Sequence, residues 1–471
     1  MKLKKLQISY FIKILCYIFL FLLPWQTRWI YQWGEISGGY FEYGTLSFYG
    51  TEILLWLIVL LSIFFKPIFL RKPCLSAGRG WGEVLSKKFW KEFFKKDKTT
   101  SKKSNIFLLI YIVILILFGV ILFNSLNFDI SLQWFTRFLG VLCLGVVILA
   151  GTESEPNEET KQSRGIENYL LALWLGAVVQ GLIALVQFFV QSIPANKWLG
   201  WAYQAGFVGG SSVIEFGGGR FLRAYGSFGS PNSLGIYLAV CLILGLILYL
   251  KVNNQKKIST SYYSLFIAGQ LLILAGLILS FSRSAWLASL ISLFFLFFII
   301  LKFYNLDFKF FIKQLLYYFL LSCLFLFLLW PLFTARFNLD NRLELRSVLE
   351  RKSQYHESLE IIANNFWWGV GPGNYTLALH EKYPDRLSWE YQPVHNIYLL
   401  SLAELGIILS TVFYILVFWL LVKIWKCHKL FFPAVLILLI VGMFDHWLFS
   451  MYTGVILFGI VLLLAVKVES E

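Results

Sequence analysis

The chain has 471 residues, of which 58% are apolar, 19% are aromatic and only 14% are charged. Soluble domains carry about a quarter charged residues, so this composition excludes a water-soluble globular protein. The formal net charge of +15 comes from 41 Lys and Arg against 26 Asp and Glu. In a membrane protein such an excess reports the orientation of the loops, and no nucleic-acid partner is expected.

Apolar runs of bilayer-spanning length recur along almost the whole chain. About 17 to 25 helical residues are needed to cross roughly 30 Å of hydrocarbon. The candidate spans are residues 8–23, 46–65, 106–123, 132–150, 169–190, 232–250, 262–280, 284–301, 311–332, 396–421, 431–447 and 450–466. The first run follows three lysines but has no small-residue cleavage site, which indicates an uncleaved span. The sequence therefore predicts an all-α polytopic membrane protein with about twelve transmembrane helices.

The distribution of basic residues predicts the orientation of these spans. Residues 66–105 contain twelve Lys and Arg against three acids, which is typical of a cytoplasmic loop. The lysine clusters within 251–257, 302–313 and 423–429 fall on the same side, so both termini are expected in the cytoplasm. The acidic loop 153–167 is the exception, although acids contribute little to the orientation rule.

Two predicted external loops, residues 191–231 and 333–395, are too long to be simple turns. Long loops on a rigid scaffold commonly carry function. In the second loop, apolar residues between 343 and 362 recur every three or four positions, which predicts a helix lying on the bundle or on the membrane surface. The six cysteines include no C-x-x-C pair, so neither a metal site nor a disulfide framework is expected.

Arginines near the external ends of spans are the first candidate site residues. Arg220 and Arg223 precede a glycine-rich segment in which Ser230 and Pro231 suit a helix start. This arrangement fits an anion site at a helix N-terminus, and equally a glycine-rich turn with solvated arginines. Arg283 lies in a tight turn, where it fits either a phosphate ligand or a side chain reaching the lipid headgroups.

A second group lies around the second long loop. Arg351 precedes a glycine block with Gly369, Gly371, Gly373 and Asn374, which lacks the Gly-Lys-Ser/Thr of a nucleotide-binding loop.

His395-Asn396 follows at the start of a span, and Glu404 lies about 13 Å deeper on the same helix. A neutral imidazole at this boundary fits a proton acceptor, and equally a surface cap. Glu404 is expected to be a buried structural partner.

Further histidines allow simpler interpretations. His356 is expected to form a local surface pair with Glu360. Asp445-His446 fits either a second polar site or a marker of the membrane boundary.

The order of these motifs resembles the O-antigen ligase and O-antigen polymerase superfamily. The resemblance rests on Arg223 with Gly-Ser-Phe-Gly-Ser-Pro-Asn, Ser282-Arg283-Ser284, Arg351 before Gly-Val-Gly-Pro-Gly-Asn-Tyr, and His395-Asn396 with Glu404. It covers residues 223–404. Tyr355 and Phe366 stand where relatives usually carry Trp and Pro, and the basic loop 66–105 is unusual for the family.

The resemblance implies a GT-C-like glycosyltransferase of the inner membrane that works on the external face without a metal or any other cofactor. It would move a glycan from undecaprenyl diphosphate, with inversion, to a hydroxyl on a lipid, a glycan or a protein, for example in lipopolysaccharide synthesis. His395 would take the acceptor proton, and Arg223, Arg283 and Arg351, with Arg220, would hold the diphosphate. Asn396, Glu404, Gly369, Gly371, Gly373 and Asn374 would support them.

Three activities within the superfamily stay open: ligase, polymerase and protein O-oligosaccharyltransferase. A transporter of lipid-linked sugar is the non-catalytic alternative, although no internal repeat supports inverted halves. The expected domains are N-terminal spans (1–222), a ligase-like core (223–410) and C-terminal spans (411–471).

Overall fold

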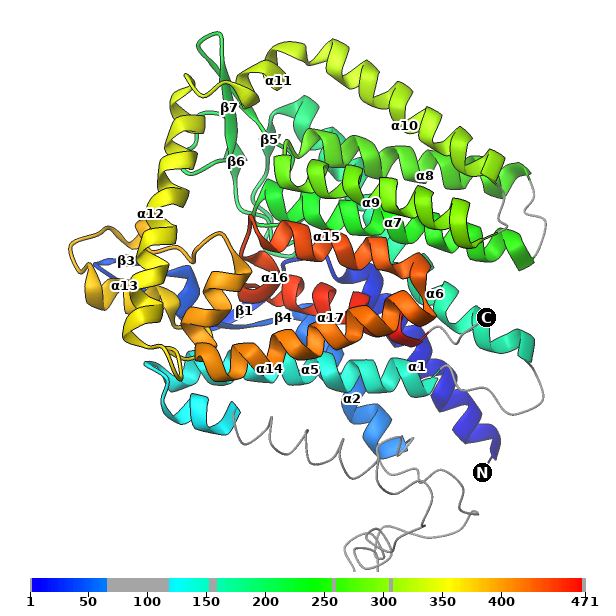
Figure 1. Ribbon diagram of the computed structural model, residues 1–471, viewed down its shortest axis with the longest axis horizontal. Coiled ribbons are helices and arrows are strands. Elements are labelled where there is room, and N and C mark those ends of the chain that lie inside the picture. Colours follow the sequence, from blue (N-terminus) through cyan, green and yellow to red (C-terminus); the bar gives the residue numbers. More distant parts are fainter. Residues whose placement is uncertain (1, 66–117, 152–158, 256–259, 305–307, 468–471) are drawn as a thin grey trace, which may run out of the picture.

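A computed structural model describes residues 2–65, 118–151, 159–255, 260–304 and 308–467. The structure is mostly helical, and its long helices run side by side in one bundle (Figure 1). The bundle consists of α1 (Lys2–Leu22), α2 (Gly50–Phe65), α5 (Phe128–Gly151), α6 (Glu159–Val190), α7 (Pro231–Gln255), α8 (Thr260–Leu279), α9 (Arg283–Phe303), α10 (Phe308–Leu328), α14 (Ile397–Cys427), α15 (Phe432–Gly442) and α17 (Tyr452–Lys467).

The helix lengths confirm a multi-pass membrane protein. Within the described residues, the seven helices α5 to α10 and α14 are long and apolar enough to cross a membrane, and shorter apolar helices occur within α1, α2, α17 and the segment ending in α15. Most of the predicted span 106–123 lies outside the described residues, so the count of twelve stays a prediction.

Three predicted spans are corrected at their ends. The segment 46–65 begins as a strand, β4 (Leu46–Tyr49), before α2. The segment 311–332 is broken at Leu329, and Pro331 falls in the first turn of a separate helix, α11 (Trp330–Phe337). This position suits proline because it lacks an N–H group. The segment 431–447 ends its helix at Gly442, before Asp445 and His446.

Helix α7 forms the centre of the bundle. The apolar window of this span is entirely buried, and the helix packs against α6, α8, α9 and α15. Its start matches the prediction, because Ser230 Oγ accepts a hydrogen bond from Ser233 N (3.2 Å) and Pro231 opens the helix. A central helix without a lipid-facing side gives the loops at its ends a fixed platform.

Within the described residues, one end of the bundle carries four short two-stranded antiparallel sheets, hairpins among them, that an all-α fold does not predict. Their strands are β1 (Arg28–Gln32) with β4, β2 (Glu35–Ile36) with β3 (Gly39–Tyr40), β5 (Ser192–Ile193) with β6 (Gln204–Ala205), and β7 (Val213–Phe216) with β8 (Gly219–Leu222). The same end holds α12 (Arg342–Asn364), α13 (Tyr375–Lys382) and α16 (Trp447–Ser450). We call it the hairpin end. Helix α1 begins and α17 ends at the opposite end (Figure 1).

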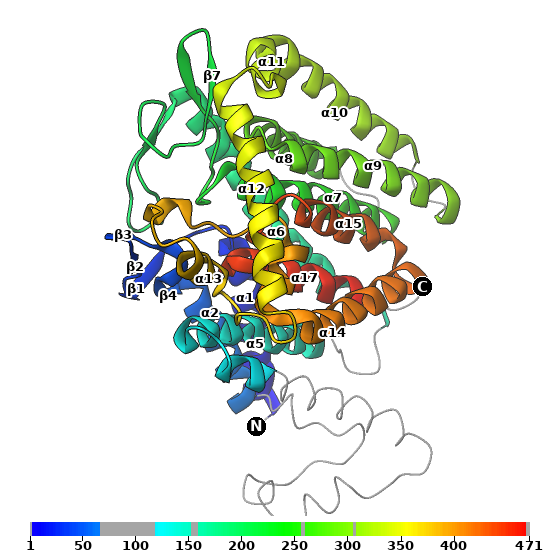
Figure 2. The ribbon, with the colours of Figure 1, turned by 60° about the vertical axis from the view of Figure 1, so that its left-hand side comes forward.

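Helix α12 confirms the helix predicted in the second long loop, and it crosses the bundle axis instead of joining it (Figures 1 and 2). Most of its predicted apolar stripe does not face the bundle, because Leu345, Val348, Leu349 and Leu359 are exposed, whereas Tyr355 and Ile362 pack partly buried against the core. The side that faces the protein instead buries residues that include Glu344 and Glu357. The membrane-surface alternative of the prediction therefore fits α12 better than the bundle-packing alternative.

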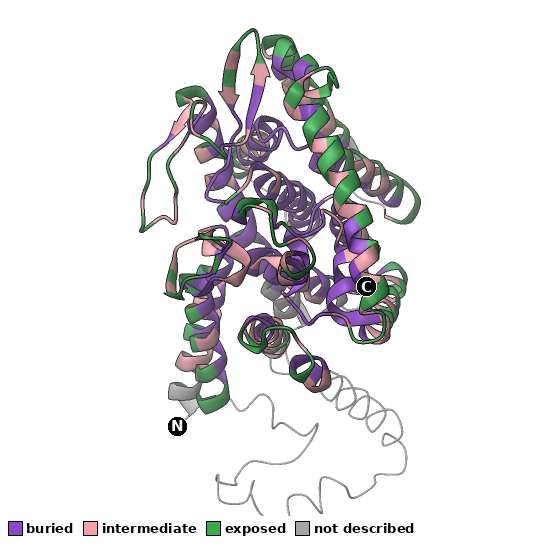
Figure 3. Cartoon of the chain, turned by 90° about the vertical axis from the view of Figure 1, so that its left-hand side faces the viewer, coloured by how far each residue is buried: buried purple, intermediate pink, exposed green. Residues whose placement is uncertain are grey.

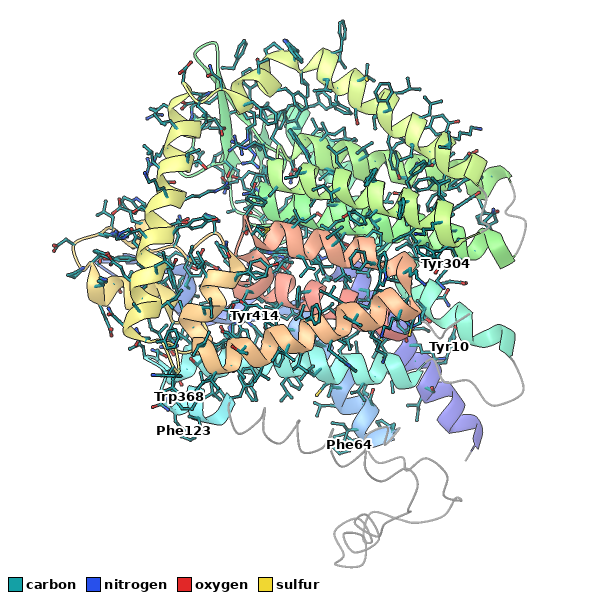
Figure 4. The ribbon with its side chains drawn as sticks, in the orientation of Figure 1. Tyr10, Phe64, Phe123, Tyr304, Trp368 and Tyr414 are labelled. Atoms are coloured by element: carbon teal, nitrogen blue, oxygen red, sulfur yellow. The ribbon has the colours of Figure 1, made fainter. Side chains whose placement is uncertain are left out.

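Viewed from the hairpin end, buried residues gather in the interior of the molecule and many exposed residues lie in the outer loops and helices (Figure 3). Trp368 lies near this end, whereas Tyr10 and Tyr304 lie near the opposite end (Figure 4). Aromatic residues of this kind gather at the two interfaces of a membrane. The hairpin end is thus the part of the molecule where polar loops can form a water-accessible site.

Candidate functional site

A cavity of about 610 Å³ lies at the hairpin end. Four separate parts of the chain line it: the β1–β4 region, the loop between β5 and α7, the segment before α14, and the segment that joins α15 to α17. Its polar lining includes Arg28, Glu42, Tyr43, Ser230, Asn232, Gln392, His395, Asp445 and His446. The cavity therefore combines the predicted His395 with residues that the sequence did not connect to it.

His395 and His446 lie next to each other in this cavity. Their ring centroids are 5.0 Å apart, and His395 N donates a hydrogen bond to Gln354 Oε1 of α12 (3.4 Å). His395 Nδ1 is buried and has no hydrogen-bond partner among the described residues. Burial lowers the pKa of His395 below its usual 6.5, and the nearby Arg351 charge lowers it further, against the opposing effect of Asp445. His395 is therefore a neutral imidazole at pH 7.

A chain of hydrogen bonds begins at Asp445, the sequence neighbour of His446, and leads toward the arginines. Asp445 Oδ1 accepts from Trp447 N (2.9 Å) and its Oδ2 accepts from Asn232 Nδ2 (3.5 Å). Asn232 Oδ1 in turn accepts from Arg223 Nη2 (2.7 Å). Asn232, at the start of α7, thus joins Asp445 to a cluster of arginines.

The arginine cluster is held by one carboxylate and by backbone carbonyls. Glu344 of α12 pairs with Arg283 Nη2 (3.1 Å) and with Arg336 Nη1. Arg283 Nη1 donates to Arg336 O (3.1 Å), and Arg223 Nε donates to Ser280 O (2.8 Å). Burial and the neighbouring Arg336 charge hold the pKa of Arg223 well below its usual value. Three guanidinium groups around one carboxylate leave a net positive charge that favours an anion.

The structure brings together three of the four predicted arginines. Arg351 lies close enough for its charge to lower the pKa of both Arg336 and His395. Arg220, in contrast, lies on the β7–β8 hairpin, 3.7 Å from Glu215, and lines a separate cavity of about 800 Å³. Arg220 is therefore placed apart from the cluster that contains Arg223 and Arg283.

The glycine block docks on a kink in α14. Gly369, Gly371, Gly373 and Gly406 have φ values of +69°, +95°, +78° and +65°, which side chains disfavour. Val370 N donates to Ala403 O (3.0 Å), and Gly371 N donates to Glu404 O (2.9 Å). The loop thus satisfies helix carbonyls that the kink leaves free.

Glu404 and the two asparagines have local structural contacts. The Glu404 carboxylate accepts from Gly373 N (2.7 Å) and Tyr375 N (3.3 Å), as expected for a buried structural partner. Asn374 Nδ2 donates to Ser131 Oγ (2.7 Å), which fixes the loop to α5. Asn396 Oδ1 caps α14 by accepting from Tyr398 N (2.9 Å). Asn396 thus fixes the start of α14 directly after His395, whereas Glu404 and Asn374 hold the glycine loop.

Sequence reasoning missed four residues of the site. Arg28 forms two hydrogen bonds with Glu42 (2.6 and 2.8 Å), and the Tyr43 ring packs edge-on against His446, 6.0 Å between centroids. These three residues follow the first span in what looked like a short connection. Arg336, like Arg283, lies next to an apolar run, and this position was the one feature of the sequence that could have marked it as a site residue.

The predicted surface pair of His356 with Glu360 is confirmed, with 3.2 Å between His356 Nδ1 and Glu360 Oε1.

Comparison with known protein families finds a similarity in the second half of the chain. Residues 268–414 match the family model described as O-antigen ligase, which confirms the predicted resemblance to the O-antigen ligase superfamily. The protein is thus a multi-pass membrane protein in which residues 268–414 are similar to the O-antigen ligase family. The match runs from α8 into α14 and includes Arg283, Arg351 and His395, whereas Arg223 and His446 lie outside it. No curated protein matches the chain.

Proposed function

We propose that the protein is a glycosyltransferase that moves a glycan from undecaprenyl diphosphate to an acceptor hydroxyl at the external face of the inner membrane. The observation that carries this proposal is the position of His395, a neutral imidazole in a cavity whose lining residue Asn232 is hydrogen-bonded to Arg223 of the arginine cluster. The O-antigen ligase match supports the same interpretation, because it includes His395, Arg283 and Arg351, although Arg223 lies outside it. The domain division expected from the sequence, with a ligase-like core at 223–410, stays part of this proposal.

The proposed reaction uses His395 as a general base. The imidazole accepts the proton of the acceptor hydroxyl while that oxygen attacks the anomeric carbon, and the bond between this carbon and the diphosphate breaks with inversion. Negative charge then grows on the departing diphosphate. Arg223, Arg283 and Arg351 stabilise this charge, because fixed cations at a poorly hydrated site act strongly on developing anions. No metal ion or nucleotide sugar takes part in this scheme.

Transfer in reconstituted membranes tests the proposal. Proteoliposomes would receive an undecaprenyl diphosphate-linked glycan, a chelator and one of three acceptors: a lipid core, a free glycan or a Ser/Thr peptide. A ligase is expected to modify the lipid core, and the glycan and peptide acceptors test polymerase and protein O-oligosaccharyltransferase activity. Movement of the donor across the membrane without any transfer product would instead identify a transporter of lipid-linked sugar.

Replacing Arg283 with alanine is expected to reduce transfer by about 10²-fold, because one fixed cation near the leaving group is lost. Radiolabelled donor turned over under single-turnover conditions measures the effect. Arg342→Ala is the matched control, since Arg342 is an exposed arginine on α12 that pairs with Glu215. Equal activities of the two variants would show that Arg283 does not act on the diphosphate.

A further inference from the structure

We propose that His395, Asp445 and His446 form a binding site for a divalent transition-metal ion such as Zn²⁺, and that the bound ion switches transfer off. The second half rests on the proposed role of His395 as the base. The ligand atoms of the three side chains all lie within 4.8 Å of one another. Two imidazoles and one carboxylate are a ligand set that binds Zn²⁺ while leaving a fourth position open.

The surroundings of the three side chains suit metal ligands. His395 Nδ1 is buried without a hydrogen-bond partner among the described residues, so a metal there displaces no existing contact. His446 Nδ1 lies 2.6 Å from Ser450 Oγ, which fixes the ring and leaves Nε2 free for coordination. Trp447 N holds Asp445 Oδ1 at 2.9 Å. Metal sites generally rely on such outer hydrogen bonds to orient their ligands.

Closing the site takes only small side-chain rotations. Zinc bonds of about 2.0 to 2.1 Å in a tetrahedron place ligand atoms about 3.3 Å apart, so the most distant pair must approach by about 1.5 Å. Asp445 and His446 lie between α15 and α16, and His395 precedes α14, so none of the three is fixed within a long helix. The open position then faces the 610 Å³ cavity.

The bound ion would inhibit transfer reversibly. A nitrogen of His395 that is coordinated to a metal has no lone pair left for the acceptor proton. The second ring nitrogen of the neutral imidazole already carries a hydrogen, so it cannot accept the acceptor proton either. No bond of the substrate changes in this step, and removal of the ion by a chelator restores the base.

Metal binding can be measured without any transfer assay. The purified full-length protein, treated with EDTA and then freed of it, would be titrated with Co²⁺ by visible absorption and with Zn²⁺ by calorimetry. We expect one tightly bound ion with a tetrahedral cobalt spectrum, and at least about tenfold weaker binding in both His446→Ala and Asp445→Asn. The matched controls are His356→Ala, on the exposed side of α12, and His380→Ala, in α13, where the His380 ring packs against Tyr391. Unchanged binding in the first two variants, with their folding verified by gel filtration, would overturn the site.

Inhibition by the bound ion is tested separately, by measuring transfer activity. Each protein would be compared with its own chelator-treated activity, and Zn²⁺ is expected to remove most of it in the wild type at the concentration that fills the site. In His446→Ala the same concentration is expected to remove much less. If Zn²⁺ binds but transfer stays unchanged, the proposed inhibition is wrong. A protein without transfer under any condition would contradict the proposed function, whereas the cobalt titration would still decide whether the metal site exists.

Discussion

Replacing His395 with alanine is expected to reduce glycan transfer by about 10²- to 10⁴-fold, because the acceptor hydroxyl then has no positioned base. The arginine cluster is untouched by this change, so binding of the undecaprenyl diphosphate donor should stay near the wild-type level. Transfer would be followed by gel shift of the glycosylated acceptor, and donor binding by equilibrium dialysis in detergent, both with a chelator present.

The matched control for this experiment is His356→Ala. His356 also lies at the hairpin end, but it is exposed on α12 and pairs with Glu360, so its loss should leave transfer within about twofold of wild type, as for most surface changes. Retained donor binding without transfer would exclude the transporter alternative. Full activity of His395→Ala would place the base elsewhere, and His446, 5.0 Å away between ring centroids, would be the next candidate.

Replacing Gly369 with alanine is expected to lower the free energy of unfolding by about 3 to 4 kcal/mol. The left-handed backbone costs about 1 to 2 kcal/mol for a residue with a side chain. In addition, the new Cβ would lie 2.4 Å from Glu404 O and 2.6 Å from Gly406 N, so the loop must leave the kink in α14. That movement breaks two backbone hydrogen bonds, each worth about 1 kcal/mol.

Gly38 separates these two contributions. It has a φ of +70°, close to the +69° of Gly369, but a Cβ there meets nothing within 4 Å. Gly38→Ala is therefore expected to cost only the backbone term of about 1 to 2 kcal/mol. Denaturant unfolding of both variants in the same detergent measures the difference. Equal destabilisation would show that the glycine loop does not need its close contact with α14.

The membrane helices were predictable because their signal is local. Runs of apolar residues predicted α5 to α10 and α14, and Ser230-Pro231 predicted the start of α7. The pairing of β1 with β4 was not predicted, because Leu46–Tyr49 is mainly apolar and continues directly into α2. Hydropathy alone therefore assigns the strand and the helix to one span. The orientation of α12 was also out of reach, because helical periodicity shows which residues share a face but not what that face meets.

The candidate site was predictable only where a motif carried it. His395 and the arginines of the turns belong to recognisable blocks, whereas Arg28 and Arg336 gain meaning only from partners found by folding. His446 shows the same limit, since 51 positions of sequence separate it from His395 and only the packing of α14 on α15 brings the rings together. Arg220 was grouped with Arg223 by proximity in sequence, and the β7–β8 hairpin separates them in space.

Helix α12 contacts both the arginine cluster and His395, and so it fixes the distance between them. Glu344, in its first turn, holds Arg283 and Arg336, while Gln354 contacts the backbone of His395. Ten helical residues fix about 15 Å between these two points. The anion cluster and the base therefore share one rigid element, and a push on the exposed apolar side of α12 would shift both together.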